Sequence, residues 1–170
     1  AMMPLQGLTQ GAQPIVSYNY GARNAQRVRA AFRCLLRACV TYSLLLWALV
    51  QLFPRMFILM FNSSPELVEY ASWALRIYMA ATGIFGVQIA CQQTFVALGN
   101  AKTSLFLAVL RKIILLIPLI YILPNFFADK AFAVFLAEPV ADVLAVLTTS
   151  TMFAFQFKRS MAELEKRPEL

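Results

Sequence analysis

The sequence predicts an all-α, polytopic transmembrane helix bundle. Of its 170 residues, 61% are hydrophobic and only 14% are charged, and the mean hydropathy is +0.68. A soluble domain is usually closer to half apolar and a quarter charged. The charged residues gather in short polar breaks between long apolar segments, as the loops of a membrane protein do. We therefore expect roughly four full membrane spans, preceded by the end of a fifth helix.

The first element is expected to be the end of a helix, over residues 1–18. Glycine and proline interrupt this apolar stretch, and its glutamines would be costly against lipid, so they should face protein or a wet cavity. Tyr18 and Tyr20 suit the headgroup level, and Gly21 can take the positive φ that ends a helix. A start inside a helix, with no signal peptide ahead of it, is what we expect of a fragment.

A basic segment follows at residues 19–37, predicted as a cytoplasmic loop or surface helix. Its arginines have near-helical spacing: Arg23, Arg27, Arg29, Arg33 and Arg37. Lysine and arginine beside apolar spans mark the cytoplasmic side of a membrane. With this segment inside, alternation of the spans places Lys102 and the charged tail at residues 158–170 inside as well. The opposite side receives only Arg55, Arg76 and Lys130. The sequence therefore predicts a multi-pass protein with a cytoplasmic C-terminus.

Four membrane spans are predicted after the basic segment. They cover residues 38–61, 65–98, 105–123 and 131–157. Each is long enough for a helix rising ~1.5 Å per residue to cross a hydrocarbon core of about 30 Å. Capping residues are expected at their ends: Ser64 ahead of Pro65, Gly99 with Asn100, Thr103 or Ser104, and Asp129.

The last span carries two carboxylates, Glu138 and Asp142, which lie four residues apart and therefore on one face of a helix. Acidic groups at membrane depth are expensive and usually face a bundle interior, often as proton or cation sites. The preceding span offers Arg111 and Lys112, of which one can snorkel to the interface while the other meets Asp142. Two interpretations stay open: a buried structural ion pair, or a direct role with a coupling ion. Glu138, Asp142 and Arg111 are the candidate polar or ion-coupling network.

A second set of candidate residues lies on one face of the span at residues 65–98. Its members fall within a stripe of about 100° at helical period: Tyr78, Phe85, Gln88, Gln92 and Phe95. Aromatic rings alternating with amides suit an adaptable pocket for flat or cationic organic molecules. The same pattern also suits helix packing, with glutamines hydrogen-bonding between helices. Both interpretations stay open.

Two further features interrupt or tighten the predicted helices. Gly86 and Ala90 form a small-xxx-small pair, which permits close approach of another helix. Pro118 and Pro139 lie inside their spans, where a proline either kinks a helix or breaks it near a transporter's binding site.

Several function classes are excluded by what the sequence lacks. It has no histidine, which is the commonest general base and zinc ligand. The cysteines Cys34, Cys39 and Cys91 have no metal-binding spacing and are expected to be buried small hydrophobes. No nucleophile elbow or phosphate loop is present, so we predict neither an enzyme nor a cofactor. The basic residues lie in loops beside apolar spans rather than on one face of a domain, which argues against nucleic-acid binding.

Three ordered motifs carry a resemblance to a known family. Residues 10–24, QGAQPIVSYNYGARN, are similar to the end of the eighth helix of multidrug and toxic compound extrusion (MATE) transporters. Residues 95–102, FVALGNAK, together with Arg111 resemble the junction of helices ten and eleven. Residues 137–142, AEPVAD, resemble the start of helix twelve.

This resemblance implies an antiporter of the inner membrane, built from two six-helix lobes, that extrudes organic and often cationic compounds or drugs in exchange for Na⁺ or H⁺. The chain would be a part of the C-terminal lobe, from the end of helix eight to helix twelve, and its partner in the bilayer would be the N-terminal lobe. The helix that matches helix ten carries Gln88, Gln92 and Gln93 but no carboxylate, so the family's ion site is not carried over.

Two rival functions are kept beside this interpretation. A flippase for lipids or lipid-linked oligosaccharides should have a more strongly cationic cavity, for which only Arg111 and Lys112 are available. A non-transporting membrane scaffold predicts that Gln88 and Gln92 pack against helices without any cavity.

Overall fold

The structure, a computed structural model, describes residues 3–61 and 64–166, and every regular element in them is a helix. This confirms the predicted all-α fold. The elements are α1 (Met3–Gly21), α2 (Ala25–Leu52), α3 (Pro54–Leu59), α4 (Pro65–Tyr78), α5 (Thr82–Ala97), α6 (Ala101–Val109), the π-helix η1 (Leu110–Leu116), α7 (Ile117–Ile122), the 3₁₀-helix η2 (Leu123–Asn125) and α8 (Lys130–Glu165).

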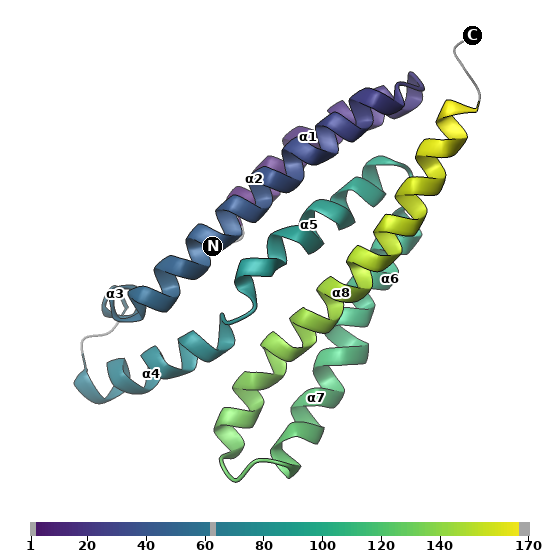
Figure 1. Cartoon of the computed structure of the whole chain (residues 1–170). Helices are drawn as coiled ribbons and strands as arrows, with labels where there is room; N and C mark the ends of the chain where they lie inside the picture. The colour runs from purple at the N-terminus through teal and green to yellow at the C-terminus, as the bar shows by residue number, and fades with distance from the viewer. Residues whose placement is uncertain (1–2, 62–63, 167–170) are drawn as a thin grey trace.

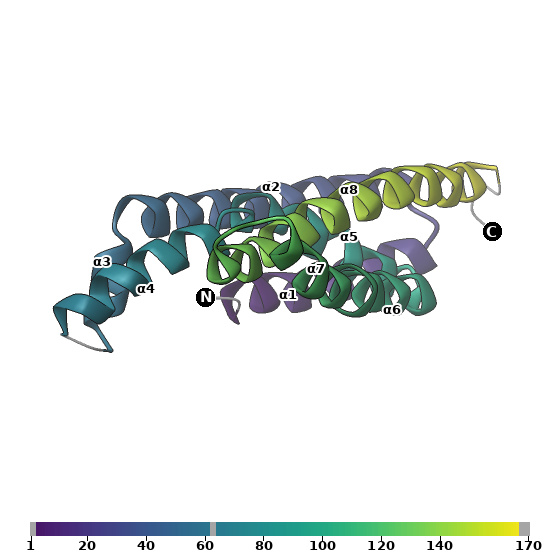
Figure 2. The ribbon, with the colours of Figure 1, turned by 90° about the horizontal axis from the view of Figure 1, so that it is seen from below.

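The long helices run roughly parallel to one another, and the bundle is flat (Figures 1 and 2). Seen from below, α1, α6 and α7 lie on one side, α2 and α8 on the other, and α5 between them (Figure 2). The central helix α5 packs against α1, α2 and α8. Within the described residues, three helical segments are long and apolar enough to cross a membrane: Ala25–Leu52, Ala101–Asn125 and Lys130–Glu165. The pair α4 and α5, bent by 45°, is a fourth if it counts as one span.

The turn between α1 and α2 differs from the one expected. The residue with positive φ is Arg23, at 56°, and not Gly21, which is the last residue of α1. The Arg23 amide bonds the Tyr20 carbonyl at 3.1 Å, and the Asn24 amide bonds the Asn19 carbonyl at 2.9 Å. These two bonds form a Schellman motif, which puts the left-handed residue two positions later than the glycine. Asn24 then caps α2, since its Oδ1 accepts from the Arg27 amide.

The basic segment and the span that follows it form one helix. α2 runs for 28 residues from Ala25 to Leu52, so most of the segment predicted at residues 19–37 is its first half. Cys34, expected to be buried, is exposed on this half, while Cys39 and Cys91 are buried as expected. Pro54 then begins the short helix α3.

The span predicted at residues 65–98 is broken between α4 and α5. Ser64 and Pro65 begin α4 as predicted, but residues 79–81 form tight turns instead of continuing the helix. The Ala80 amide bonds the Ile77 carbonyl, so the Arg76 carbonyl loses the partner it would have in an α-helix. In the same way, the Ile84 amide bonds the Ala81 carbonyl and leaves the Ala80 carbonyl without its helical partner. These two carbonyls accept from side chains of α2: Gln51 Nε2 donates to the Arg76 carbonyl and Trp47 Nε1 to the Ala80 carbonyl, each at 2.9 Å. The Tyr78 carbonyl is bypassed as well, because the Thr82 amide bonds the Met79 carbonyl. Because backbone groups inside a membrane need a protein partner, these two side chains make the break tolerable.

The crossing of α2 and α5 is close because Gly86 has no side chain. A Cβ at Gly86 would lie 2.6 Å from Ser43 Oγ and 2.7 Å from the Cys39 carbonyl carbon. This contact agrees with the close approach predicted for the Gly86 and Ala90 pair. α5 ends at Ala97, Gly99 after it has a φ of 80°, and the Asn100 amide bonds the Phe95 carbonyl at 2.8 Å. The predicted C-cap is therefore confirmed.

The next span begins earlier than predicted and contains a π-helix. Asn100, rather than Thr103 or Ser104, is the N-cap of α6, and Thr103 donates to its side chain at 2.9 Å. The π-helix covers Leu110–Leu116.

The last helix, α8, is longer than the span predicted at residues 131–157. Asp129 caps it as predicted, since Oδ1 accepts from the Ala131 and Phe132 amides at 2.9 and 3.2 Å. Pro139 lies inside α8 without ending it, and the helix continues to Glu165. Most of the tail predicted at residues 158–170 is therefore an extension of this helix.

Candidate functional site

The candidate site lies where the π-helix η1 faces α8. Arg111 Nε donates to Asp142 Oδ1 at 2.5 Å, and its Nη2 lies 3.3 Å from Glu138 Oε1. Lys112 Nζ lies 2.9 Å from the same Glu138 oxygen. Both predicted carboxylates are therefore ion-paired, and both cations of the preceding span reach them. The structure thus contains the ion pair that one of the two interpretations predicted.

The local backbone explains why two consecutive cations reach one helix. Glu138 and Asp142 project together because they lie four residues apart on α8. Arg111 and Lys112 lie in a π-helical turn, which has more residues per turn than an α-helix, so successive side chains diverge less. Such turns are rare and frequently occur at functional sites.

The cluster is largely removed from solvent, and its charges balance. Glu138 is 8% exposed and Asp142 is 6% exposed. The Arg111 side chain is 16% exposed, whereas that of Lys112 is 52% exposed. A buried carboxylate is stable in its charged form only with a close partner, so the two cations make ionised Glu138 and Asp142 possible at this depth.

Arg111 also joins a third helix to the cluster. Its guanidinium carbon lies 4.3 Å from the centroid of the Phe85 ring on α5. A guanidinium over a ring face is attracted by the ring quadrupole. Arg111 therefore connects η1, α5 and α8 at one point.

A cavity of about 380 Å³ opens beside this cluster. It is lined by Gln6, Tyr78, Met79, Thr82, Phe85, Ile89, Arg111, Lys112, Glu138 and Asp142. Its lining combines the aromatic rings of Tyr78 and Phe85 with four charged groups. Such a mixture is typical of a small-molecule site.

The predicted face of aromatic and amide residues is divided by the structure. Tyr78 and Phe85 line the cavity, on either side of the break between α4 and α5. Gln88 is buried, and Gln92 Nε2 donates to the Ser104 carbonyl at 3.0 Å. Phe95 is buried edge-to-face against Phe153, with ring centroids 5.1 Å apart. Gln92 and Phe95 thus make interhelical contacts of the kind that the packing interpretation expected, whereas the buried Gln88 Oε1 has no hydrogen-bond partner among the described residues.

Several cavity residues did not appear among the sequence candidates. Gln6 lies in the N-terminal helix whose glutamines were expected to face protein or a wet cavity, so a signal for it was available. Met79 is the first residue of the break after α4 and Thr82 the first residue of α5, and both line the cavity there. No local signal marks that break, so they could not have been found from the sequence.

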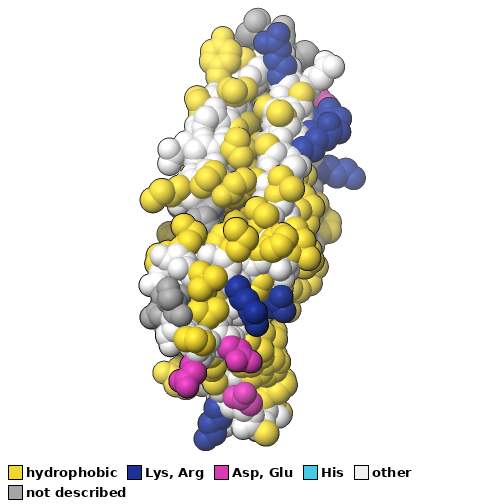
Figure 3. All heavy atoms as spheres, turned by 90° about the vertical axis from the view of Figure 1, so that its left-hand side faces the viewer, with side chains coloured by type: hydrophobic (Ala, Val, Ile, Leu, Met, Phe, Trp, Pro, Cys, Tyr) yellow, Lys and Arg dark blue, Asp and Glu magenta, His cyan; other side chains and the backbone are white. Residues whose placement is uncertain are grey.

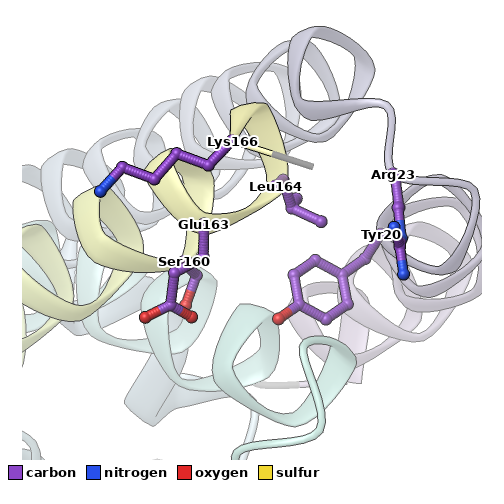
Figure 4. Close-up of a pocket in the computed structure, with 6 residues that line it drawn as sticks. All are labelled: Tyr20, Arg23, Ser160, Glu163, Leu164 and Lys166. Atoms are coloured by element: carbon purple, nitrogen blue, oxygen red, sulfur yellow. The ribbon is translucent and has the colours of Figure 1, made fainter. Parts of the chain in front are cut away.

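A separate hollow of about 390 Å³ lies between the ends of α1 and α8. It is lined by Tyr20, Arg23, Ser160, Glu163, Leu164 and Lys166. Figure 4 shows the Tyr20 hydroxyl directed toward Ser160 and Glu163, while the Lys166 amine points away from the hollow. The charged residues that line this hollow do not form ion pairs with one another among the described residues, unlike those of the cluster at Arg111. We therefore take the cluster at Arg111 as the candidate site.

Comparison with known proteins identifies a family model and several similar transporters. A family model described as MatE matches residues 1–122. A solved structure of the MATE multidrug transporter DinF-BH is 35% identical, with a TM-score of 0.82, over 90% of this chain and 34% of that one. The Vibrio cholerae MATE transporter VcmN in its bent form has a TM-score of 0.80 at 17% identity, over 92% of this chain and 35% of that one.

A curated relative adds a different substrate. The FAD transporter of Shewanella oneidensis is 22% identical over 143 residues, which are 84% of this chain and 31% of the relative. The chain therefore spans about a third of the length of the transporters it matches.

Proposed function

The chain belongs to the MatE family of membrane transporters, and we propose that it forms part of the C-terminal lobe of a multidrug efflux antiporter. This antiporter exports organic, often cationic compounds in exchange for Na⁺ or H⁺. It works by alternating access, in which two lobes rock around a central cavity. The N-terminal lobe of the same transporter and the lipid bilayer are the partners of this chain.

The observation that carries the proposal is the cavity beside the Arg111 cluster. The rings of Tyr78 and Phe85 give the cavity apolar surface for a flat organic molecule, although Arg111 already covers one face of Phe85. Glu138 and Asp142 line the same cavity, and their negative charge is balanced by Arg111 and Lys112. The cavity is thus suited to an amphipathic organic substrate rather than to a strongly charged one.

The proposed role of the cluster is to couple ion binding to movement. A proton or Na⁺ bound at Asp142 weakens the attraction of this carboxylate to Arg111. Because Arg111 connects η1, α5 and α8, weakening this pair loosens all three helices at once. Glu138, Asp142 and Arg111 act in this scheme as a polar network tied to the conformational change, more structural than ligating.

The proposed orientation puts the N-terminal half of α2 and the end of α8 in the cytoplasm of a cell with the transporter in its inner membrane. Figure 3 shows dark blue basic side chains toward both ends of this face, with most of the magenta acidic ones in its lower half. The support for a cytoplasmic C-terminus is the count of basic residues, since the arginines before and within the first half of α2 and the basic residues near the end of α8 outnumber Arg55, Arg76 and Lys130 at the other end.

A second candidate substrate class is a nucleotide-like anion, because one relative is an FAD transporter. Arg111 and Lys112 suit phosphate oxygens, which also keeps the flippase in view. The neighbouring Glu138 and Asp142 oppose an anion, so this candidate ranks second. A scaffold without transport agrees with the hydrogen bond from Gln92 to the Ser104 carbonyl but has no use for the cavity.

The test follows ethidium efflux by the intact protein in cells that lack their own drug pumps, with and without a Na⁺ gradient. We expect wild type to pump and Asp142→Asn to accumulate normally but lose efflux. Glu163→Gln is the matched control, since it also neutralises an acid on α8 but at an exposed position. If Asp142→Asn pumps like wild type, the carboxylate has no coupling role. If wild type moves no ethidium under either gradient, the drug-efflux proposal fails, and FAD export is measured instead.

A further inference from the structure

The N-terminal half of α2 carries a groove that the transport site does not use. Ala30, Arg33, Cys34 and Arg37 line it, and it encloses about 280 Å³. All four residues are exposed and lie one turn apart along a single face of the helix. Ala30 and Cys34 have small side chains, so this face leaves room beside the two arginines for a group the size of a phosphate.

Among the described residues, the two arginines of this groove have no carboxylate partner. At this end of the molecule, Glu165 pairs with Arg29 at 2.5 Å. Glu163 pairs with Arg159. Within residues 3–61 and 64–166, no acidic side chain pairs with Arg33 or Arg37. Arg33 Nε instead donates to the Arg29 carbonyl at 3.3 Å, which holds its side chain along the helix. The groove therefore presents two uncompensated positive charges.

The same face of α2 becomes apolar toward the middle of the membrane. At about 100° per residue, Leu44, Leu45 and Leu52 lie within about 60° of the line through the groove. Their exposed fractions are 47%, 60% and 68%. Leu45 follows Arg37 by about 12 Å of helix rise, inside a leaflet that is half of a ~30 Å hydrocarbon core. A polar head at the arginines and a hydrocarbon chain along the leucines can thus belong to one molecule.

We propose that this face of α2 binds one anionic phospholipid of the leaflet at the basic end of the bundle. Its phosphodiester lies between Arg33 and Arg37, whose planar guanidinium groups suit phosphate oxygens. Its acyl chain lies along Leu44, Leu45 and Leu52. Basic residues next to a membrane attract anionic lipids in this way. The site is separate from the proposed transport cavity, since the two share no lining residue.

The other hollow at this end is a poorer place for such a lipid. Its lining includes Glu163, and the Lys166 amine points away from it (Figure 4). An anionic headgroup there would face a carboxylate, whereas the groove on α2 contains no acid.

The exposed thiol of Cys34 reports directly on the groove, because the other cysteines of the chain are buried. The intact protein is placed in nanodiscs of phosphatidylcholine with increasing fractions of phosphatidylglycerol. Maleimide labelling of Cys34 is followed by mass spectrometry of its peptide. For each variant, the labelling rate with phosphatidylglycerol is divided by the rate in pure phosphatidylcholine. This ratio removes any effect of the arginines on the reactivity of the Cys34 thiol. A parallel series in pure phosphatidylcholine contains inorganic phosphate instead.

Phosphatidylglycerol is expected to slow the labelling of Cys34. Arg33→Gln and Arg37→Gln should each raise, about fivefold, the fraction of phosphatidylglycerol that halves the labelling rate of Cys34. This factor corresponds to the loss of about 1 kcal/mol of attraction for each basic residue at the membrane surface. Lys158→Gln removes an exposed cation near the C-terminal end of α8, outside the groove, and should leave this fraction of phosphatidylglycerol unchanged. The proposal is overturned if phosphatidylglycerol does not protect, if both arginine variants are protected like wild type, or if phosphate alone protects. It is also overturned if Cys34 is unlabelled in every disc, since the face is then covered by protein.

Discussion

Replacing Arg111 by methionine should strongly destabilise the protein, and the size of the effect follows from its contacts. Arg111 lies 2.5 Å from Asp142 and 3.3 Å from Glu138. At an effective dielectric constant of ~20, unit charges ~4 Å apart attract by about 4 kcal/mol. Breaking a buried ion pair by removing one partner typically costs about 3–5 kcal/mol.

The estimate for this site lies near the middle of that range. Two buried carboxylates lose a partner, which favours the upper end. Lys112 stays 2.9 Å from Glu138, but its side chain is 52% exposed, so water screens its charge. We expect a loss of about 4 kcal/mol, which is roughly a thousandfold in the unfolding equilibrium at ~1.4 kcal/mol per tenfold.

The assay is reversible unfolding of the intact protein in mixed micelles with increasing denaturing detergent. The decisive comparison is the triple variant Arg111→Met, Glu138→Gln and Asp142→Asn, which removes all three charges together. Replacing a complete buried ion-pair set by neutral groups is often close to neutral. The triple variant should therefore return to within about 1–2 kcal/mol of wild type.

Two results would refute this reasoning. If Arg111→Met unfolds within about 1 kcal/mol of wild type, the pairs contribute little to stability. If the triple variant is as unstable as the single one, the loss comes from the contact of Arg111 with the Phe85 ring rather than from stranded charge.

Two further predictions concern the contact between α2 and the bent pair α4 and α5. Gly86→Ala should destabilise by about 3 kcal/mol, the upper end for overpacking, because the added Cβ meets Ser43 and the backbone beside it. Gly11→Ala is the control, because an added Cβ at Gly11 meets nothing within 4 Å, and it should stabilise the protein by about 0.5–1 kcal/mol. Equal unfolding midpoints for Gly86→Ala and Gly11→Ala would contradict the close crossing of α2 and α5. Trp47→Phe removes the donor to the Ala80 carbonyl and should cost about 1–3 kcal/mol. Hydrogen exchange should rise at residues 79–84 but not in α8, and unchanged exchange there would show that the indole does not hold the break.

The identity of the ion-pair partners could be narrowed from the sequence but not decided. Two carboxylates four residues apart in an apolar helix must find cations, and the preceding span offered Arg111 and Lys112. The sequence left it open whether one cation snorkels to water. The structure brings both to Glu138, because the π-helical turn directs consecutive side chains toward α8.

The spans, the helix caps and the spacing of the two carboxylates could be predicted from the sequence, because each depends on local chemistry. Apolar length sets the number of spans, and Ser64, Gly99 and Asp129 act as predicted because capping depends on a few neighbouring backbone groups. The spacing of Glu138 and Asp142 likewise follows from helix geometry alone.

Only the tertiary structure decided where the helices bend and which side chains meet. Residues 79–81 contain nothing that forbids a helix, and the break there depends on Trp47 and Gln51 reaching across from α2. The broken span then places Tyr78 and Phe85 at the cavity, while Gln92 donates to the Ser104 carbonyl of α6. Such choices depend on partners more than ten residues away in the chain, and a local pattern contains no information about them.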